Sequence, residues 1–156
     1  MNVLDLFSGI GCFSLGLERA GMRTAAFCEI NDFCRRVLAK HWPDIACHQD
    51  VRSLRIGRGS IDIVCGGFPC QPFSLAGVSK KNSLGRAHGF EDEKQGNLFF
   101  EIARLIDYHR PAAFVLENVK NLKSHDKGNT FKVIHTTLTE ELGYQVHHEI
   151  IDARHW

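Results

Sequence analysis

The sequence predicts an α/β fold in which a mostly parallel sheet carries helices on both faces. Short apolar runs with β-branched residues alternate with longer stretches whose apolar residues recur at helical spacing, and no internal repeat interrupts them. The 156 residues amount to one domain, and a hydrophobic fraction of 44% is sufficient for one core. Such an open sheet binds its ligand at the carboxyl ends of its strands, near the point where strand order reverses.

The elements follow one another in alternation. The expected strands are residues 3–6, 24–28, 61–65, 113–116 and 146–151. The expected helices are residues 13–20, 32–41, 98–109 and 130–142. Gly21 and Gly143 stand where C-terminal helix caps are expected.

One segment departs from this alternation. Residues 68–96 show no strong periodicity, and they are too many for an ordinary connection between a strand and a helix, so they predict a functional or disordered loop. Its first half is locally cationic, because Lys80, Lys81 and Arg86 precede any acidic residue.

Composition excludes several classes of protein. No apolar run approaches the roughly 20 residues needed to cross a bilayer, and the N-terminus lacks the features of a signal peptide, so a cytoplasmic protein without membrane contact is expected. Six cysteines without a C-x-x-C pair indicate free thiols and no metal site. A net charge of +1 weighs mildly against a complete DNA-binding protein.

A glycine turn follows the first strand at residues 5–11, DLFSGIG. Glycines there let the backbone approach a nucleotide-like ligand. The dinucleotide pattern G-x-G-x-x-G is not met, because Ser14 occupies the third glycine position. A nucleotide-type cofactor and a plain tight turn both remain open from this motif alone.

Two acidic residues follow the next two strands. Glu29 after the strand 24–28 suits the hydroxyls of a ribose, and Asp50, taken to follow a further short strand before residues 61–65, suits the amino group of an adenine. Either acid alone is more simply a helix N-terminal residue favoured by the macrodipole. Together with the glycine turn, they describe an adenosine pocket.

The strongest motif is GGFPCQPFS at residues 66–74, which places Cys70 between Pro69 and Pro72 just beyond a buried strand. A thiol is a strong nucleophile once deprotonated, and a loop beside helix N-termini favours the thiolate. A packed cysteine in a rigid turn is the structural alternative. A second candidate, Glu117, ends the apolar strand 113–116 and suits a partly desolvated proton donor or hydrogen-bond partner; its alternative is a strand-end acid that caps a loop.

These blocks, with NLFFEIAR from residue 97 and LENVK from residue 116, resemble the DNA (cytosine-5) methyltransferase family over residues 2–156. The resemblance implies a Rossmann-like S-adenosylmethionine-dependent methyltransferase fold, incomplete at the C-terminus, with residues 1–156 as the cofactor-binding catalytic domain. It implies Cys70 and Glu117 as catalytic residues. The implied cofactor-binding residues are Phe7, Ser8, Gly9, Ile10, Gly11, Glu29, Ile30, Asp50, Val51, Pro69 and Leu98. Gln71, Ser74, Lys80, Lys81 and Arg86 are implied near the DNA.

The implied reaction begins when a cytosine is flipped out of double-stranded DNA. Cys70 adds to C6, Glu117 protonates or hydrogen-bonds N3, and C5 takes the methyl group of S-adenosylmethionine, which leaves S-adenosylhomocysteine. The loop resembles that of the Dcm-type enzymes, which methylate the inner cytosine of CC(A/T)GG. The family's Gln-x-Arg-x-Arg block and target-recognition domain are not found. We therefore expect the chain to be inactive by itself. Three explanations are open: a deliberately shortened chain, a truncated reading frame, or one subunit of a split enzyme with a C-terminal partner.

Three other functions remain as alternatives to a DNA methyltransferase. A non-catalytic cofactor-binding remnant is disfavoured by the intact Cys70 and Glu117. An NAD-linked oxidoreductase is disfavoured by Ser14 and by the proline-flanked cysteine. A tRNA cytosine-5 methyltransferase is disfavoured by Phe68 before Pro69 and by the Dcm-like loop.

Overall fold

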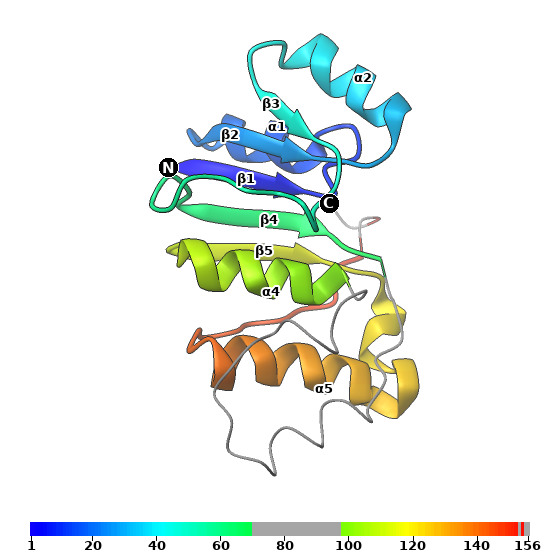
Figure 1. Ribbon diagram of the computed structural model, residues 1–156. Coiled ribbons are helices and arrows are strands. Elements are labelled where there is room, and N and C mark those ends of the chain that lie inside the picture. The colour runs from blue at the N-terminus through cyan, green and yellow to red at the C-terminus, as the bar shows by residue number, and fades with distance from the viewer. Residues whose placement is uncertain (70–97, 153, 155–156) are drawn as a thin grey trace.

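The computed structural model describes residues 1–69, 98–152 and 154, which form one parallel sheet with helices packed on it (Figure 1). The strand order is β3-β2-β1-β4-β5, and all four pairings are parallel. The strands are β1 (Asn2–Leu6), β2 (Arg23–Cys28), β3 (Ala46–His48), β4 (Ile63–Gly67) and β5 (Ala113–Glu117). The order reverses between β1 and β4, so the crevice expected for a ligand lies at their carboxyl ends.

Helices cover both faces of the sheet, as the sequence predicts. They are α1 (Cys12–Arg19), α2 (Asp32–His41), α4 (Leu98–His109) and α5 (Asn129–Thr136). Successive side chains of a strand point to opposite faces. Accordingly, Val3 joins Ile63 in a small cluster with Phe13 and Leu17 of α1. Leu4 joins the larger core that includes α4.

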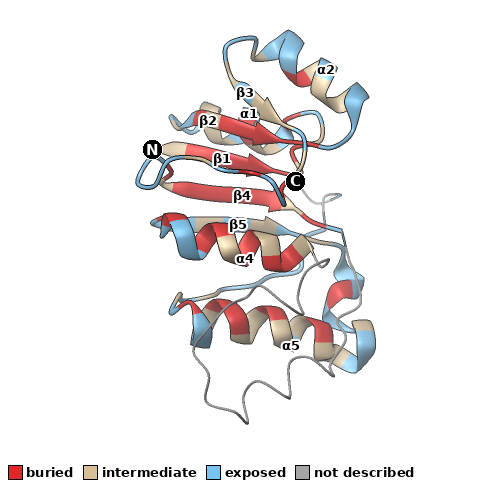
Figure 2. Cartoon of the chain, viewed as in Figure 1, coloured by how far each residue is buried: buried red, intermediate tan, exposed pale blue. Residues whose placement is uncertain are grey.

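Helix α4 forms the centre of that larger core (Figure 2). Ile102, Leu105 and Ile106, three residues of the predicted apolar face, are at most 1% exposed. Phe99 and Phe100 are also buried, so apolar residues cover more of the helix than one stripe. This burial fixes the N-terminal end of α4 beside the carboxyl edge of the sheet, where Leu98 begins the helix.

The two predicted glycine caps are confirmed. Gly21 and Gly143 have left-handed φ values of 86° and 76°, which other residues rarely adopt. The amide of Met22 then donates to the carbonyl of Leu17, and the amide of Tyr144 donates to that of Leu138. The first bond spans five residues, as in the Schellman arrangement, whereas the second spans six because residues 137–141 form a π-helical turn.

The prediction of a strand at residues 146–151 is wrong, since these residues pair with no strand in the described part of the chain. Tyr144 and Val146 are half-buried, whereas residues 147–151 are exposed. The Tyr144 hydroxyl donates to the Pro111 carbonyl at 2.8 Å, and the rings of His148 and Phe131 lie 4.8 Å apart. Alternation reports which side chains face the core, whereas a strand also needs a neighbouring backbone to accept its hydrogen bonds.

Two further differences concern boundaries. The predicted helix 130–142 is α5 followed by a π-helical turn, η3 (Thr137–Glu141). Two 3-10 turns that the sequence did not predict, η1 (Lys120–Lys123) and η2 (His125–Gly128), connect β5 to α5. Short turns of this kind lack the long periodicity from which a helix is recognised. Among the described residues, no helix is long and apolar enough to cross a membrane.

Candidate active site

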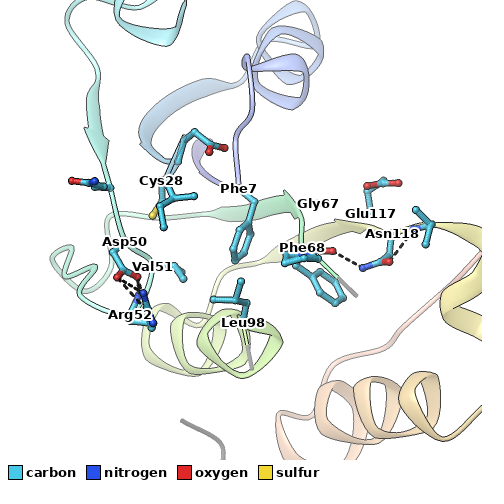
Figure 3. Close-up of a pocket in the computed structure, with 15 residues that line it drawn as sticks. Phe7, Cys28, Asp50, Val51, Arg52, Gly67, Phe68, Leu98, Glu117 and Asn118 are labelled. Carbon is cyan, nitrogen blue, oxygen red and sulfur yellow. Dashed lines mark hydrogen bonds and ion pairs between the residues drawn. The ribbon is translucent and has the colours of Figure 1, made fainter. Parts of the chain in front are cut away.

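A pocket of about 630 Å3 lies at the carboxyl edge of the sheet (Figure 3). The segments after all five strands contribute to it, and Leu98 closes one side from α4. The residues that line it are Phe7, Cys28, Glu29, Ile30, Gln49, Asp50, Val51, Arg52, Gly67, Phe68, Pro69, Leu98, Glu117, Asn118 and Val119.

Most predicted site residues in the described part of the chain meet in this pocket. Eight line it: Phe7, Glu29, Ile30, Asp50, Val51, Pro69, Leu98 and Glu117. Four do not: Ser8, Gly9, Ile10 and Gly11. Six lie outside the described residues: Cys70, Gln71, Ser74, Lys80, Lys81 and Arg86.

The glycine turn supports the pocket rather than forming its wall. Gly11 has φ 91°, and a Cβ there would lie 2.7 Å from the Trp42 ring. Its lack of a side chain therefore serves the packing of α1 against Trp42. Gly9 has φ 53° and donates its amide to Glu29 at 2.8 Å. Neither glycine lines the pocket, whereas Phe7 of the same turn does, and contact of the glycines with the ligand stays a prediction.

Glu29 is held by two backbone amides. One oxygen of its carboxylate accepts from Gly9, and the other accepts from Asn31 at 2.7 Å. The residue is 8% exposed, yet it still faces the pocket. Because each carboxylate oxygen has a second lone pair, the side chain can also accept hydrogen bonds from a diol. Its geometry is therefore fixed before any ligand arrives.

The start of α1 is anchored to β1 by a buried carboxyl that the sequence reasoning did not single out. Asp5 is fully buried and accepts from the Ser14 hydroxyl at 2.7 Å and from the Ser14 amide at 3.2 Å. Burial raises the pKa of Asp5 to about 6, and the bonds from Ser14 partly oppose that rise. Ser14, the residue that breaks the dinucleotide pattern, is thus the partner that holds this acid.

Asp50 lines the pocket from the end of β3. It is 33% exposed, and Arg52 pairs with it at 2.8 Å. The Arg52 guanidinium holds the pKa of Asp50 below its usual value, so this carboxylate is an acceptor at neutral pH. Figure 3 shows the two side chains together at one end of the pocket, near Val51 and Leu98. Arg52 was missed from the sequence because an exposed arginine two residues after an acid has no distinctive pattern.

The end of β4 lies tightly against its neighbours on both sides. A Cβ on Gly66 would lie 2.1 Å from the carbonyl oxygen of Leu6, and one on Gly67 would lie 2.8 Å from the Glu117 carboxylate. These approaches explain why the motif begins with two glycines. Glu117 is exposed, contrary to the expectation of a partly desolvated carboxyl, because β5 is an edge strand among the described residues.

Asn118 connects the ends of β4 and β5. Its side-chain amide donates to the Phe68 carbonyl at 2.7 Å, and its oxygen accepts from the Val119 amide at 2.9 Å. Phe68 is 7% exposed and packs on Phe99 with ring centroids 5.7 Å apart. The backbone just before residue 70 is therefore fixed beside Glu117. In the sequence, Asn118 stands out only as part of the motif LENVK, which indicates no role for its side chain.

The two buried cysteines among the described residues, Cys28 and Cys65, are poor candidates for a nucleophile. Cys28 lines the pocket, but burial raises its pKa to about 12, so its thiol remains protonated. Burial also raises the pKa of Cys65, which is fully buried. In the described ranges, no three potential metal ligands lie together.

Solved structures with the same fold define the class of protein. A DNA modification methyltransferase encoded within an E. coli prophage is 26% identical, covers 90% of this chain and 38% of its own, and superposes with a TM-score of 0.65. A DNMT2 from Spodoptera frugiperda, 20% identical, covers 87% and 40% with a TM-score of 0.58. The fold is that of the S-adenosylmethionine-dependent methyltransferases, and S-adenosylmethionine is the cofactor that this implies.

The family follows from the sequence comparisons. A family model described as C-5 cytosine-specific DNA methylase matches residues 1–156. The chain is 46% identical over 183 residues to a DNA-cytosine methyltransferase of Escherichia coli K12, and 46% identical over 157 residues to the type II methyltransferase M1.ScrFI of Lactococcus lactis. The chain belongs to the C-5 cytosine-specific DNA methylases, which confirms the resemblance read from its motifs and decides against an oxidoreductase.

These relatives are considerably longer than the chain. The two alignments cover 98% of this chain but only 39% and 37% of the relatives. The match therefore shows the family of these residues. The activity of a whole methyltransferase is proposed below for this chain.

Proposed function

We propose that this chain carries the cofactor-binding and catalytic part of an enzyme that methylates C5 of a flipped-out cytosine in double-stranded DNA. The observation that carries the proposal is the contact between the ends of β4 and β5. Asn118 fixes the carbonyl of Phe68, and Gly67 lies against Glu117, so the residues before Cys70 are held beside that carboxylate. A nucleophile and a proton donor from neighbouring strands suit attack on one base from two sides.

The pocket fits the adenosine part of S-adenosylmethionine. Glu29 would accept from the ribose hydroxyls, and Asp50 would accept from the adenine amino group. Phe7, Val51 and Leu98 would cover the purine, with Ile30, which is 65% exposed, against its other face. S-adenosylmethionine supplies an electrophilic methyl group. Pro69 lines the same pocket, so the methyl donor and Cys70 would share one end of it.

The chain's own residues would carry the chemistry in three steps. The Cys70 thiolate forms a bond to C6 of the cytosine, while Glu117 delivers a proton or hydrogen bond to N3, so that C5 becomes nucleophilic. C5 would then take the methyl group of S-adenosylmethionine, which leaves S-adenosylhomocysteine. Loss of the C5 proton to solvent re-forms the C5–C6 double bond and expels the Cys70 thiolate, and N3 returns its proton to Glu117. Gln71, Ser74, Lys80, Lys81 and Arg86 would contact the DNA around the extruded base.

A covalent trap tests this proposal. Fluorine at C5 cannot leave as a proton does, so a duplex that contains 5-fluorocytosine should stay attached to Cys70. We expect an adduct when S-adenosylmethionine and a C-terminal complementing fragment of a relative are supplied, because the chain spans less than two fifths of its relatives. Mass spectrometry of the tryptic peptides locates the adduct.

A matched pair of variants controls the trap. Cys70→Ser should abolish the adduct, whereas Cys12→Ser, at an exposed cysteine on α1, should leave it unchanged. An adduct that survives Cys70→Ser, or none in the complemented wild type, would show that the proposal is wrong.

A further inference from the structure

The ion pair between Asp50 and Arg52 occupies one end of the cofactor pocket. Arg52 Nε lies 3.0 Å from Asp50 Oδ1 and 3.1 Å from Oδ2, and Nη2 lies 2.8 Å from Oδ2. The backbone amide of Arg52 adds a bond of 3.0 Å to Oδ1. Both residues line the pocket.

These contacts use the accepting capacity of the Asp50 carboxylate. An ionised carboxylate offers about four lone-pair sites, and Arg52 occupies each oxygen twice. A ligand amino group that binds Asp50 must therefore displace part of the Arg52 side chain. The displacement costs little, because the Arg52 side chain is 59% exposed and exposed ion pairs are weak.

The backbone between the two side chains is held from behind. Arg104 of α4 donates to the carbonyl of Val51 at 3.1 Å, and Glu101 pairs with Arg104 at 2.8 Å. Val51 itself is 5% exposed. The wall of the pocket therefore stays fixed when Arg52 shifts, and the displaced guanidinium remains beside whatever Asp50 binds.

We propose that Arg52 is a second contact for the purine edge, donating a hydrogen bond to a ring nitrogen while Asp50 accepts from the amino group. Adenine presents a donor next to acceptors, since its amino group is flanked by the ring nitrogens N1 and N7. The Asp50–Arg52 pair presents an acceptor next to donors, which is the complementary pattern. This inference rests on the proposed function, because it takes adenine as the group that reaches Asp50.

Titration calorimetry with S-adenosylhomocysteine tests the contact directly. Arg52→Gln should weaken binding about fivefold, a loss reduced from that of a buried charged hydrogen bond by the exposure of the side chain. Arg58→Gln, at another exposed arginine on the connection to β4, should change the affinity less than twofold and controls for the lost charge. Urea unfolding should show equal midpoints for both variants.

Competition by deaza-nucleosides identifies the partner atom. Replacing N1 or N7 of adenosine by carbon removes one acceptor at a time. The analogue that lacks the partner of Arg52 should bind wild type and Arg52→Gln equally, whereas the other should still distinguish them. If both analogues distinguish them as adenosine does, the hydrogen bond to a ring nitrogen is excluded.

The outcomes separate this inference from the proposed function. Wild-type binding that is lost in Asp50→Asn but unchanged or tighter in Arg52→Gln would overturn the inference alone, and would make Arg52 a competitor for Asp50. A wild-type chain that does not bind S-adenosylhomocysteine would reject the adenosine pocket and the role of Arg52 together.

Discussion

Two acidic residues of the pocket, Glu29 and Glu117, differ in how the chain holds them. Glu29 is buried, and its carboxylate accepts two backbone amides from the turns after β1 and β2. Glu117 is exposed at the end of the edge strand β5 and approaches the backbone of Gly67. The end proposed to bind the cofactor is therefore part of the folded framework, whereas the end proposed to bind the base is an exposed surface next to it. Substitutions at Glu29 should alter stability and cofactor binding, and substitutions at Glu117 should alter the rate of methyl transfer.

The strongest test acts on the framework between these two ends. Gly66→Ala places a methyl group 2.1 Å from the Leu6 carbonyl oxygen, a backbone atom that cannot rotate away. We expect a loss of about 4 kcal/mol in the free energy of unfolding, at the upper end for single substitutions. Urea denaturation followed by circular dichroism measures it.

The control is Gly57→Ala, at an exposed glycine with no atom within 4 Å of the new Cβ. Its effect should remain within about 0.5 kcal/mol. Equal denaturation midpoints for the two variants would mean that β1 and β4 do not approach each other as described.

Alanine substitutions at the two acids test the comparison itself. Glu29→Ala removes the partner of two amides, so we expect about 3 kcal/mol of lost stability together with weak binding of S-adenosylhomocysteine. Glu117→Ala should leave stability within about 0.5 kcal/mol and cofactor binding unchanged. It should lower methyl transfer by the complemented chain about 100-fold or more.

Thermal denaturation measures stability, calorimetry measures binding of S-adenosylhomocysteine, and transfer of a tritiated methyl group to DNA measures activity. The distinction between framework and surface fails if Glu117→Ala destabilises the chain as much as Glu29→Ala does.

The sequence predicted the residues at the carboxyl edge of the sheet better than it predicted the buried residues that hold this edge in place. Residue patterns located β1, β2, α2 and α4 to within one residue at each end. The motif residues Glu29, Asp50 and Glu117 were found because acids at strand ends are chemically distinctive. Asp5 and Ser14 were not assigned, since a contact between a strand and the following helix leaves no periodic signal. The unpaired segment 146–151 shows the same limit, because alternation does not reveal whether a partner strand is present.

The last prediction concerns the pH dependence of stability at Asp5, which anchors the start of α1 to β1. Asp5 has a pKa raised from 3.8 to about 6 by burial, so the folded chain binds its proton more tightly than the unfolded chain does. The stabilising contribution of this proton is complete below pH 3.8 and is lost as the pH rises through about 6. The loss is at most about 3 kcal/mol, from 1.36 kcal/mol for each unit of pKa shift. Asp5→Asn should remove this part of the dependence.

His109 contributes a slope of the opposite sign and must be separated from that of Asp5. Burial at the end of α4 lowers the pKa of His109 from 6.5, so its protonation at acidic pH destabilises the fold. Urea midpoints across this pH range for wild type, Asp5→Asn and His109→Phe resolve the two contributions. Asp5→Asn should gain stability relative to wild type as the pH rises from 4 to 7, since the charged carboxylate is then absent. A difference that stays constant across the range would mean that Asp5 is already ionised without cost, and that Ser14 alone compensates its burial.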